Sequence, residues 1–139
     1  MSRILAIDYG EKRIGLALSD PMQIFSKPYK VVQFKSKKDF IENVLEVIKE
    51  QDVELVVLGL PWGFEGQETK KTLEVRKFGE YLQTQIPVPL KFWDERLTTS
   101  EANAELKKMG YDYIKAREFV DAVAASLILR SYLENKEDL

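Results

Sequence analysis

Three acidic residues occupy positions where a folded chain rarely carries a charge. Asp8 ends an apolar run, Glu95 follows a second one, and Asp121 interrupts a third. A carboxylate that leaves water without a partner costs several kcal/mol or becomes protonated. These positions therefore indicate salt bridges or a cation that the acids share.

The chain contains no His and no Cys, which narrows the chemistry that the acids can perform. Thiolate nucleophiles, His general bases, Ser-His-Asp triads and zinc sites built from Cys or His are all excluded. Hard-cation chemistry remains. Carboxylate oxygens suit Mg²⁺ or Mn²⁺, and a carboxylate cluster holding such ions is a common way to activate water against a phosphodiester.

Length and composition predict one domain with a full core, spanning residues 1–139. The chain has 139 residues, of which 45% are hydrophobic, as in one ordinary domain. Its apolar stretches are too short or too interrupted to span a bilayer, and its N-terminus lacks a hydrophobic signal region. We therefore expect a cytoplasmic protein with no membrane partner, and the absence of Cys agrees with that location.

The net charge of −2 argues mildly against a partner held mainly by bulk electrostatics. The basic residues are nevertheless clustered. Residues 27–38 hold five lysines and no acid, and residues 70–77 and 107–117 each carry a net charge of +3. Each cluster alone is equally well explained as a solvated surface, and only their convergence in space would make a track for phosphates.

The hydrophobic pattern predicts alternating strands and helices. Residues 3–8 and 13–19 are expected to form a hairpin around a turn at 9–12. Further strands are predicted at 29–34, 54–59 and 88–93, and helices at 39–50, 68–83, 98–108 and about 115–133. The helix at 98–108 would open with a capping box from Thr98 to Glu101. The last helix is apolar almost all round near its middle, so it should lie against the sheet.

This order of elements predicts an α/β fold with a mixed sheet, in which an antiparallel hairpin is followed by parallel crossovers. Ligands of such sheets gather beyond the carboxyl ends of the parallel strands, where Asp8 and Glu95 are expected. Asp121 would have to reach them from the last helix. We therefore expect three distant carboxylates to meet at one place.

Four motifs carry a resemblance to a known family. They are Asp8-Tyr9-Gly10 with Lys12-Arg13-Ile14-Gly15, Gly59-Leu60-Pro61 followed by Gly66, Asp94-Glu95-Arg96-Leu97-Thr98-Thr99 with Glu101-Ala102, and Asp121-x-x-Ala124-Ala125. In this order and spacing the chain resembles the YqgF/RuvX family nearly end to end. The resemblance implies a ribonuclease H-like fold related to the RuvC resolvases, with a five-stranded mixed sheet flanked by helices.

The resemblance also implies an activity and partners. It indicates a nuclease dependent on Mg²⁺ (or Mn²⁺) that processes the 5′ end of pre-16S rRNA in ribosome biogenesis, in contact with structured RNA and ribosome-assembly particles. Two alternatives remain open: a Holliday-junction resolvase acting on a DNA junction, and a non-catalytic RNA-binding assembly factor on the same fold. An actin-like ATPase is disfavoured, because those proteins close two such domains over the nucleotide. Whether the chain is a monomer or a homodimer stays open.

By the same resemblance the catalytic and metal-binding residues are Asp8, Glu95 and Asp121, which would hold two cations in a two-metal clamp. Each acid has a structural alternative. Asp8 is also suited to cap a turn, Glu95 to pair with the next residue or a lysine, and Asp121 to pair with Arg117 one helical turn earlier. Asp94 is the alternative to Glu95 as the metal ligand at this position. Because adjacent strand residues point to opposite faces, only one of the two should reach the metal, and the resemblance favours Glu95.

The candidate residues for binding the substrate's phosphates lie close to these acids in the sequence. The guanidinium group of Arg96 can donate two parallel hydrogen bonds to one phosphate. Thr98 or Thr99 adds hydroxyl and backbone donors at a helix N-terminus. The full set is Lys12, Arg13, Arg96, Thr98, Lys115 and Arg117. For each basic residue the alternative is an exposed charge without a specific role.

Two positions depart from the expected pattern. The loop after Pro61 carries Trp62 and Phe64 where the family suggests small polar residues. These aromatics suit stacking on unpaired bases, but they equally suit covering the core or a dimer contact. Ala124 stands one turn after Asp121, where the resolvase relatives tend to carry a second acid, which weakens the expectation of a strongly bound second metal.

Overall fold

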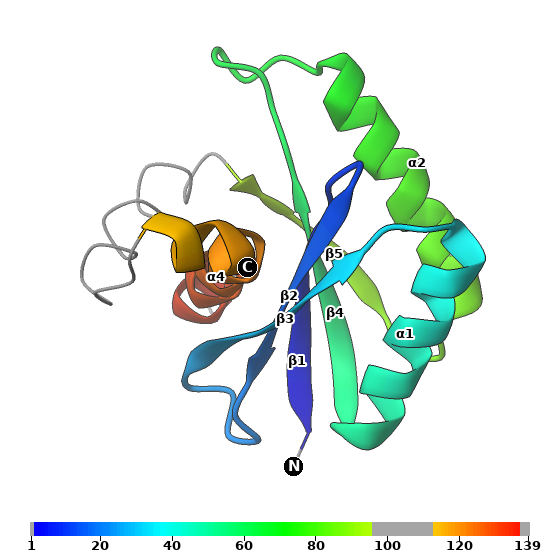
Figure 1. The fold of residues 1–139 in the computed structure, drawn as a ribbon, viewed down its shortest axis with the longest axis vertical. Helices are drawn as coiled ribbons and strands as arrows, with labels where there is room; N and C mark the ends of the chain where they lie inside the picture. The colour runs from blue at the N-terminus through cyan, green and yellow to red at the C-terminus, as the bar shows by residue number, and fades with distance from the viewer. Residues whose placement is uncertain (1, 96–112, 137–139) are drawn as a thin grey trace.

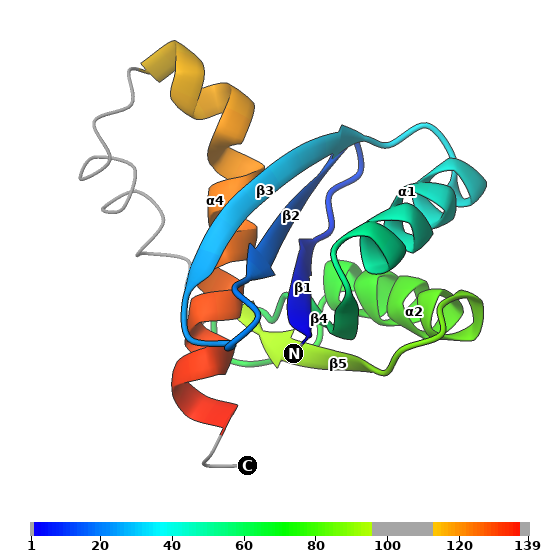
Figure 2. The same ribbon diagram turned by 90° about the horizontal axis from the view of Figure 1, so that it is seen from below.

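The computed structural model describes residues 2–95 and 113–136, with the backbone alone for residues 113–119. Its centre is a five-stranded mixed sheet in the order β3-β2-β1-β4-β5. Two helices cover one face of the sheet and α4 crosses the other (Figures 1 and 2). The elements are β1 (Arg3–Asp8), β2 (Arg13–Ser19), β3 (Ser26–Gln33), α1 (Lys37–Glu50), β4 (Val53–Leu60), α2 (Lys70–Gln85), β5 (Leu90–Asp94) and α4 (Tyr113–Asn135).

The predicted fold class is confirmed. β1 pairs antiparallel with β2 and parallel with β4, and β4 pairs parallel with β5. The largest difference in a strand boundary is at β3, which begins at Ser26 rather than at residue 29, because its pairing with β2 extends to Ser19. The predicted helix at 98–108 lies outside the described residues.

The alternation of side chains along the strands divides the core into two parts. On β1, Leu5 and Ile7 pack with α1 and α2, whereas Ile4 and Ala6 pack against α4. The part beneath α4 consists of Ile4, Ala6, Ala17, Val57, Ala125, Ile128, Leu129 and Tyr132. As the apolar composition of the last helix predicts, α4 buries its middle against the sheet, and the small side chains of Ala6 and Ala17 leave room for it.

Within the described ranges, no helix is long and apolar enough to cross a bilayer.

Candidate active site

The predicted acids come together at the carboxyl ends of the parallel strands β1, β4 and β5, which form one side of the sheet. These strands are parallel neighbours, so their carboxyl ends share one edge. Asp8 is the last residue of β1, and its place in the alternation puts it on the face that α4 covers, with Ile4 and Ala6. Glu95 directly follows β5, two residues after Trp93, which packs on that same face. Asp94 alternates to the opposite face, which supports Glu95 as the residue that joins the site.

Asp8 is the centre of the acidic cluster. Its pKa is raised well above the usual value, first by burial, then by a hydrogen bond with the Glu95 side chain, and then by the negative charges of Glu95 and Asp121. The ammonium group of Lys71 acts in the opposite direction. A carboxyl group in this position either keeps a proton or requires a cation close by.

Asp121 reaches the cluster from α4 and pairs with a residue of the first hairpin. Arg13 Nε donates a hydrogen bond of 3.0 Å to Asp121 Oδ2. The Asp121 side chain is 23% exposed and the Arg13 side chain 50% exposed. The alternative partner Arg117 has its side chain outside the described residues. Among the residues that the structure describes, no three acidic side chains are arranged to hold a metal ion. Asp8 is hydrogen-bonded to Glu95, and Asp121 is paired with Arg13.

Two glycines in the neighbouring strands allow this close approach. Gly15 pairs with Asp8 across the hairpin, and a Cβ atom there would lie 1.9 Å from the backbone oxygen of Asp121. Gly59 lies on the other side of Asp8, one residue beyond the Ile7–Leu58 pair. A Cβ atom at Gly59 would lie 2.7 Å from Glu95 Oε1. Both glycines stand in the recognised motifs, but their packing role depends on contacts between distant residues and was not predicted.

The predicted phosphate-binding residues are placed only in part. Arg13 lies at the site, as described above, and Lys12 lies beside it at the hairpin turn, with its side chain exposed and its backbone oxygen accepting a hydrogen bond of 2.9 Å from Phe34 N. Arg96 and Thr98 lie outside the described residues, as do the side chains of Lys115 and Arg117. Their roles stay predictions.

Lys71 is a site residue that the sequence analysis did not single out. It lies in the first turn of α2, and its Nζ is 5.4 Å from the centroid of the Tyr9 ring, next to Asp8. Its charge favours the ionised form of Asp8. The signal in the sequence was the basic cluster at 70–77, of which Arg76 is bound elsewhere, in an ion pair of 2.6 Å with Glu68.

The sheet order, with two helices on one face and α4 on the other, defines a ribonuclease H-like fold. The structure resembles T. thermophilus RuvC in complex with Holliday junction substrate, with a TM-score of 0.63, 15% identity, and coverage of 99% of this chain and 97% of that one. It also resembles the Fowlpox virus resolvase in complex with substrate Holliday junction DNA, with a TM-score of 0.56, 15% identity, and coverage of 96% and 98%. At these identities the likeness shows the fold alone.

The sequence defines the family. The RuvX family profile, described as "Holliday junction resolvase", matches residues 2–135. A protein of Maridesulfovibrio salexigens named "Putative pre-16S rRNA nuclease" is 39% identical, over 94% of this chain and 97% of its own length. A protein of Dictyoglomus thermophilum with the same name is 38% identical, over 96% of each. The chain belongs to the RuvX family, as its motifs predict.

The two glycines give a paired prediction about stability. Gly15→Ala places a methyl group against the backbone of α4, which can yield only if the helix moves, so we expect the free energy of unfolding to fall by about 3 kcal/mol or more. Gly59→Ala meets side-chain atoms of Glu95 and Ile128, which can rotate away, and should cost about 1–2 kcal/mol. Urea unfolding followed by circular dichroism measures both. Equal losses would contradict this account of the packing.

The raised pKa of Asp8 gives a prediction about pH. The folded state binds this proton more tightly than the unfolded state, so the stabilisation is complete in acid and is lost as the pH rises through the raised pKa. Asn cannot ionise. In EDTA, Asp8→Asn should therefore melt a few degrees above the parent at pH 7 to 8, and the difference should shrink toward about pH 4.

Asp20 is the matched control for this experiment. Its pKa is lowered, chiefly by the backbone N–H of Phe25, so its ionised form supports the fold at neutral pH and that support is lost as the pH falls through the lowered pKa. Asp20→Asn should consequently melt below the parent at pH 7. If both variants shifted the melting temperature in the same direction, the electrostatic account of Asp8 would be wrong.

Proposed function

We propose that this protein is a divalent-metal-dependent endonuclease that hydrolyses phosphodiester bonds. The observation that carries the proposal is the gathering of Asp8, Glu95 and Asp121 from β1, the end of β5 and α4. Burial, a hydrogen bond with Glu95, and the charges of Glu95 and Asp121 together raise the pKa of Asp8. A fold gains no stability from bringing like charges together in this way. Such a cluster is suited to a cation, and a cation among carboxylates is suited to a phosphate.

The chemistry of the donor set fits Mg²⁺ or Mn²⁺. The three candidate ligands are all carboxylates, which suit these hard ions, and the chain has no His or Cys to favour zinc. Asp8, Glu95 and Asp121 are the residues that would hold the metal. When bound, a metal of this kind activates water and offsets the charge that develops on the phosphate. Because Ala124 stands where a further acid would be expected, we propose that a second ion binds weakly.

The basic residues around the acids are suited to the substrate. Arg13 and Lys71 lie on different sides of the cluster, on β2 and α2, and each is already oriented by a contact with the site: Arg13 by Asp121 and Lys71 by the Tyr9 ring. We propose that both contact the phosphates that flank the bond to be cut. Lys12, Arg96, Thr98, Lys115 and Arg117 complete the proposed set of substrate contacts.

We propose the 5′ end of pre-16S rRNA as the substrate, in the cytoplasm and in the context of the assembling ribosome. The names of the relatives from M. salexigens and D. thermophilum support this substrate. A DNA junction is the second candidate, because the family profile is described as a Holliday junction resolvase. A resolvase that cuts two symmetric strands requires a two-fold dimer, whereas end processing of RNA does not.

The acids give a direct test of activity. With Mg²⁺ or Mn²⁺, the parent should cut precursor rRNA, a DNA junction, or both, when these are offered side by side. Asp8→Asn, Glu95→Gln and Asp121→Asn should each lose at least about 100-fold, since even the outer partners of metal ligands typically contribute 10–100-fold. Gel electrophoresis of end-labelled substrates measures the rates.

Asp94→Asn is the matched control, since Asp94 is adjacent to Glu95 but alternates to the other face of the sheet. It should retain activity within a few-fold of the parent. If the parent cuts neither substrate yet binds RNA, the non-catalytic assembly factor replaces the nuclease. If two of the three acid variants turn over normally, these acids are not the active site.

Metal binding can be measured without any substrate. A cation that binds only the folded state at 100 times its Kd stabilises it by about 2.7 kcal/mol. We therefore expect Mn²⁺ to raise the melting temperature of the parent by several degrees over its value in EDTA. Asp8→Asn and Asp121→Asn should show little of this rise. The same rise in Asp94→Asn and in Asp8→Asn would place the metal elsewhere.

A further inference from the structure

The loop between β4 and α2 presents one aromatic ring to solvent. Phe64 is 101% exposed, more than any other large hydrophobic side chain among those that the structure describes. Its neighbour Trp62 behaves differently, because it packs against the core and lies under the guanidinium group of Arg76, at 5.6 Å from Cζ to the ring centroid. Of the two aromatics that depart from the family pattern, one therefore covers the core and the other faces outward.

The tip of this loop is built as a hydrogen-bonded turn. Gly63 N donates to Gln67 O at 2.8 Å, and Gly66 N donates to Gly63 O at 2.9 Å. Glu65 N donates to the side-chain oxygen of Gln67 at 2.9 Å. Gly66 has a φ of +83°, a conformation that glycine adopts at little cost. Three hydrogen bonds thus enclose Phe64 in a turn that holds its ring outside.

The base of the loop is fixed as well. The Thr72 hydroxyl donates to Pro61 O, and Thr72 also belongs to the capping box that opens α2. Arg76, which covers Trp62, is held by its ion pair with Glu68. Because both ends of the loop are anchored, the outward position of Phe64 is a property of the fold rather than of a loose segment.

The loop lies at the same edge of the sheet as the acids. It leaves the carboxyl end of β4, between the ends of β1 and β5 in the sheet order, and it rises beyond that end of the sheet at the top of Figure 1. Phe64 lies five positions after Gly59, where an added Cβ atom would lie 2.7 Å from Glu95 Oε1. Their Cα atoms are therefore no more than about 18 Å apart, a distance that a short stretch of nucleotides covers.

We propose that Phe64 stacks on an unpaired base of the nucleic acid whose backbone reaches the acids. This inference rests on the proposed function, which supplies the polymer. The loop of residues 61–69 contains two acids and no basic residue, so its contact with a polyanion has to be made through the ring rather than through charge. Phe64 stands between Gly63 and Glu65, so its ring is not part of the contiguous apolar area that a protein partner requires. A nucleic-acid base needs only one flat face, which a single ring provides.

This contact would make the protein select substrates with single-stranded nucleotides next to the bond to be cut. A fully paired duplex keeps its bases stacked on each other and offers no free face to Phe64. The selection would not depend on sequence, because every base has a π-face.

The test compares the binding of a single-stranded RNA and of a duplex of the same length, by fluorescence anisotropy in EDTA so that no strand is cut. Phe64→Leu keeps an apolar side chain but removes the ring. It should weaken binding of the single strand roughly 5- to 150-fold, the range for one stacked base, and leave the duplex within two-fold of the parent. Phe64→Trp should retain the parent's affinity.

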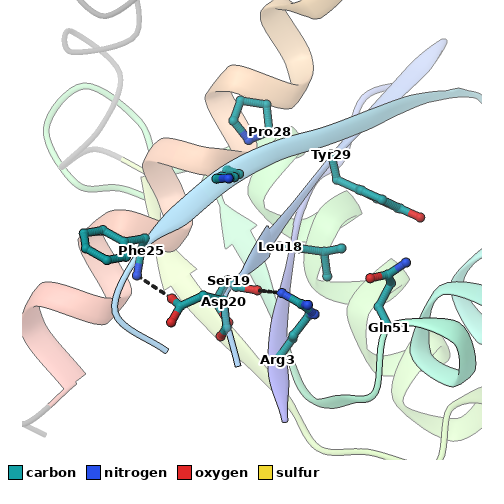
Figure 3. Close-up of a pocket in the computed structure, with 9 residues that line it drawn as sticks. Arg3, Leu18, Ser19, Asp20, Phe25, Pro28, Tyr29 and Gln51 are labelled. Carbon is teal, nitrogen blue, oxygen red and sulfur yellow. Dashed lines mark hydrogen bonds between the residues drawn. The ribbon is translucent and has the colours of Figure 1, made fainter. Parts of the chain in front are cut away.

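Phe25→Leu is the matched control, because Phe25 is another exposed phenylalanine at 67%. It lies at the opposite edge of the sheet, after β2, where its backbone N–H donates to Asp20 Oδ1 at 2.6 Å beside a cavity of about 360 Å³ (Figure 3). This substitution should change neither affinity. A 2-aminopurine base in the single strand should lose fluorescence on binding the parent, as it does when stacked, and lose less on binding Phe64→Leu.

Three results would overturn the proposal. The first is a parent that binds neither nucleic acid, and the second is a Phe64→Leu variant that binds the single strand like the parent. The third is an unchanged affinity together with a change of oligomeric state in light scattering, which would assign Phe64 to a contact between two copies of the chain. Ring-dependent binding by a parent that cuts nothing with Mn²⁺ would uphold this inference and reject the nuclease, so the two failures are distinguishable.

Discussion

Repulsion among three carboxylates is the constraint around which the rest of the molecule is organised. Asp8, Glu95 and Asp121 come from separate elements. The pKa of Asp8 is raised first by its burial and then by its hydrogen bond with Glu95 and the charges of the other two acids, so both its burial and their proximity disfavour its charge. Apolar packing has to hold them together, and it does so through α4. Ala125, Ile128 and Leu129, within eight residues of Asp121, are buried against β1, β2 and β4. The helix that brings the third acid is therefore also one of the best packed elements of the described chain.

The sheet provides the complementary half of this arrangement. A strand places successive side chains on opposite faces, so the end of β1 can offer a carboxylate to α4 while Ile7 stays in the other part of the core. On each side of Asp8 the neighbouring strand carries a glycine, and the free space is filled by the Asp121 backbone in one case and by the Glu95 side chain in the other. The glycines leave the space that the acids need to approach one another, while the packing of α4 holds them there.

The sequence was sufficient to predict most of the fold and that the three acids lie near one another, and the reason is physical. Strand and helix periods are local, and a carboxylate at the end of an apolar run is visible without a structure. The pair of Arg13 and Asp121 was not predictable, because 108 residues separate them. The loop with Trp62 and Phe64 was equally undecided, since both aromatics fit the same pattern. Trp62 is covered by Arg76, and the Thr72 hydroxyl binds the backbone oxygen of Pro61 at the base of the loop; only the packing of α2 reveals these contacts.

The charges at the site suggest how the binding of metal and substrate depend on each other. Arg13 and Lys71 are the described basic residues with contacts at the cluster, and two cations do not neutralise three acids. A phosphate backbone that approaches this edge of the sheet therefore meets a negative centre between positive flanks. A divalent cation held by the acids would reverse the sign of that centre and remove the repulsion. If the nuclease proposal is correct, metal binding and substrate binding must then favour each other, because linkage between two binding equilibria is reciprocal.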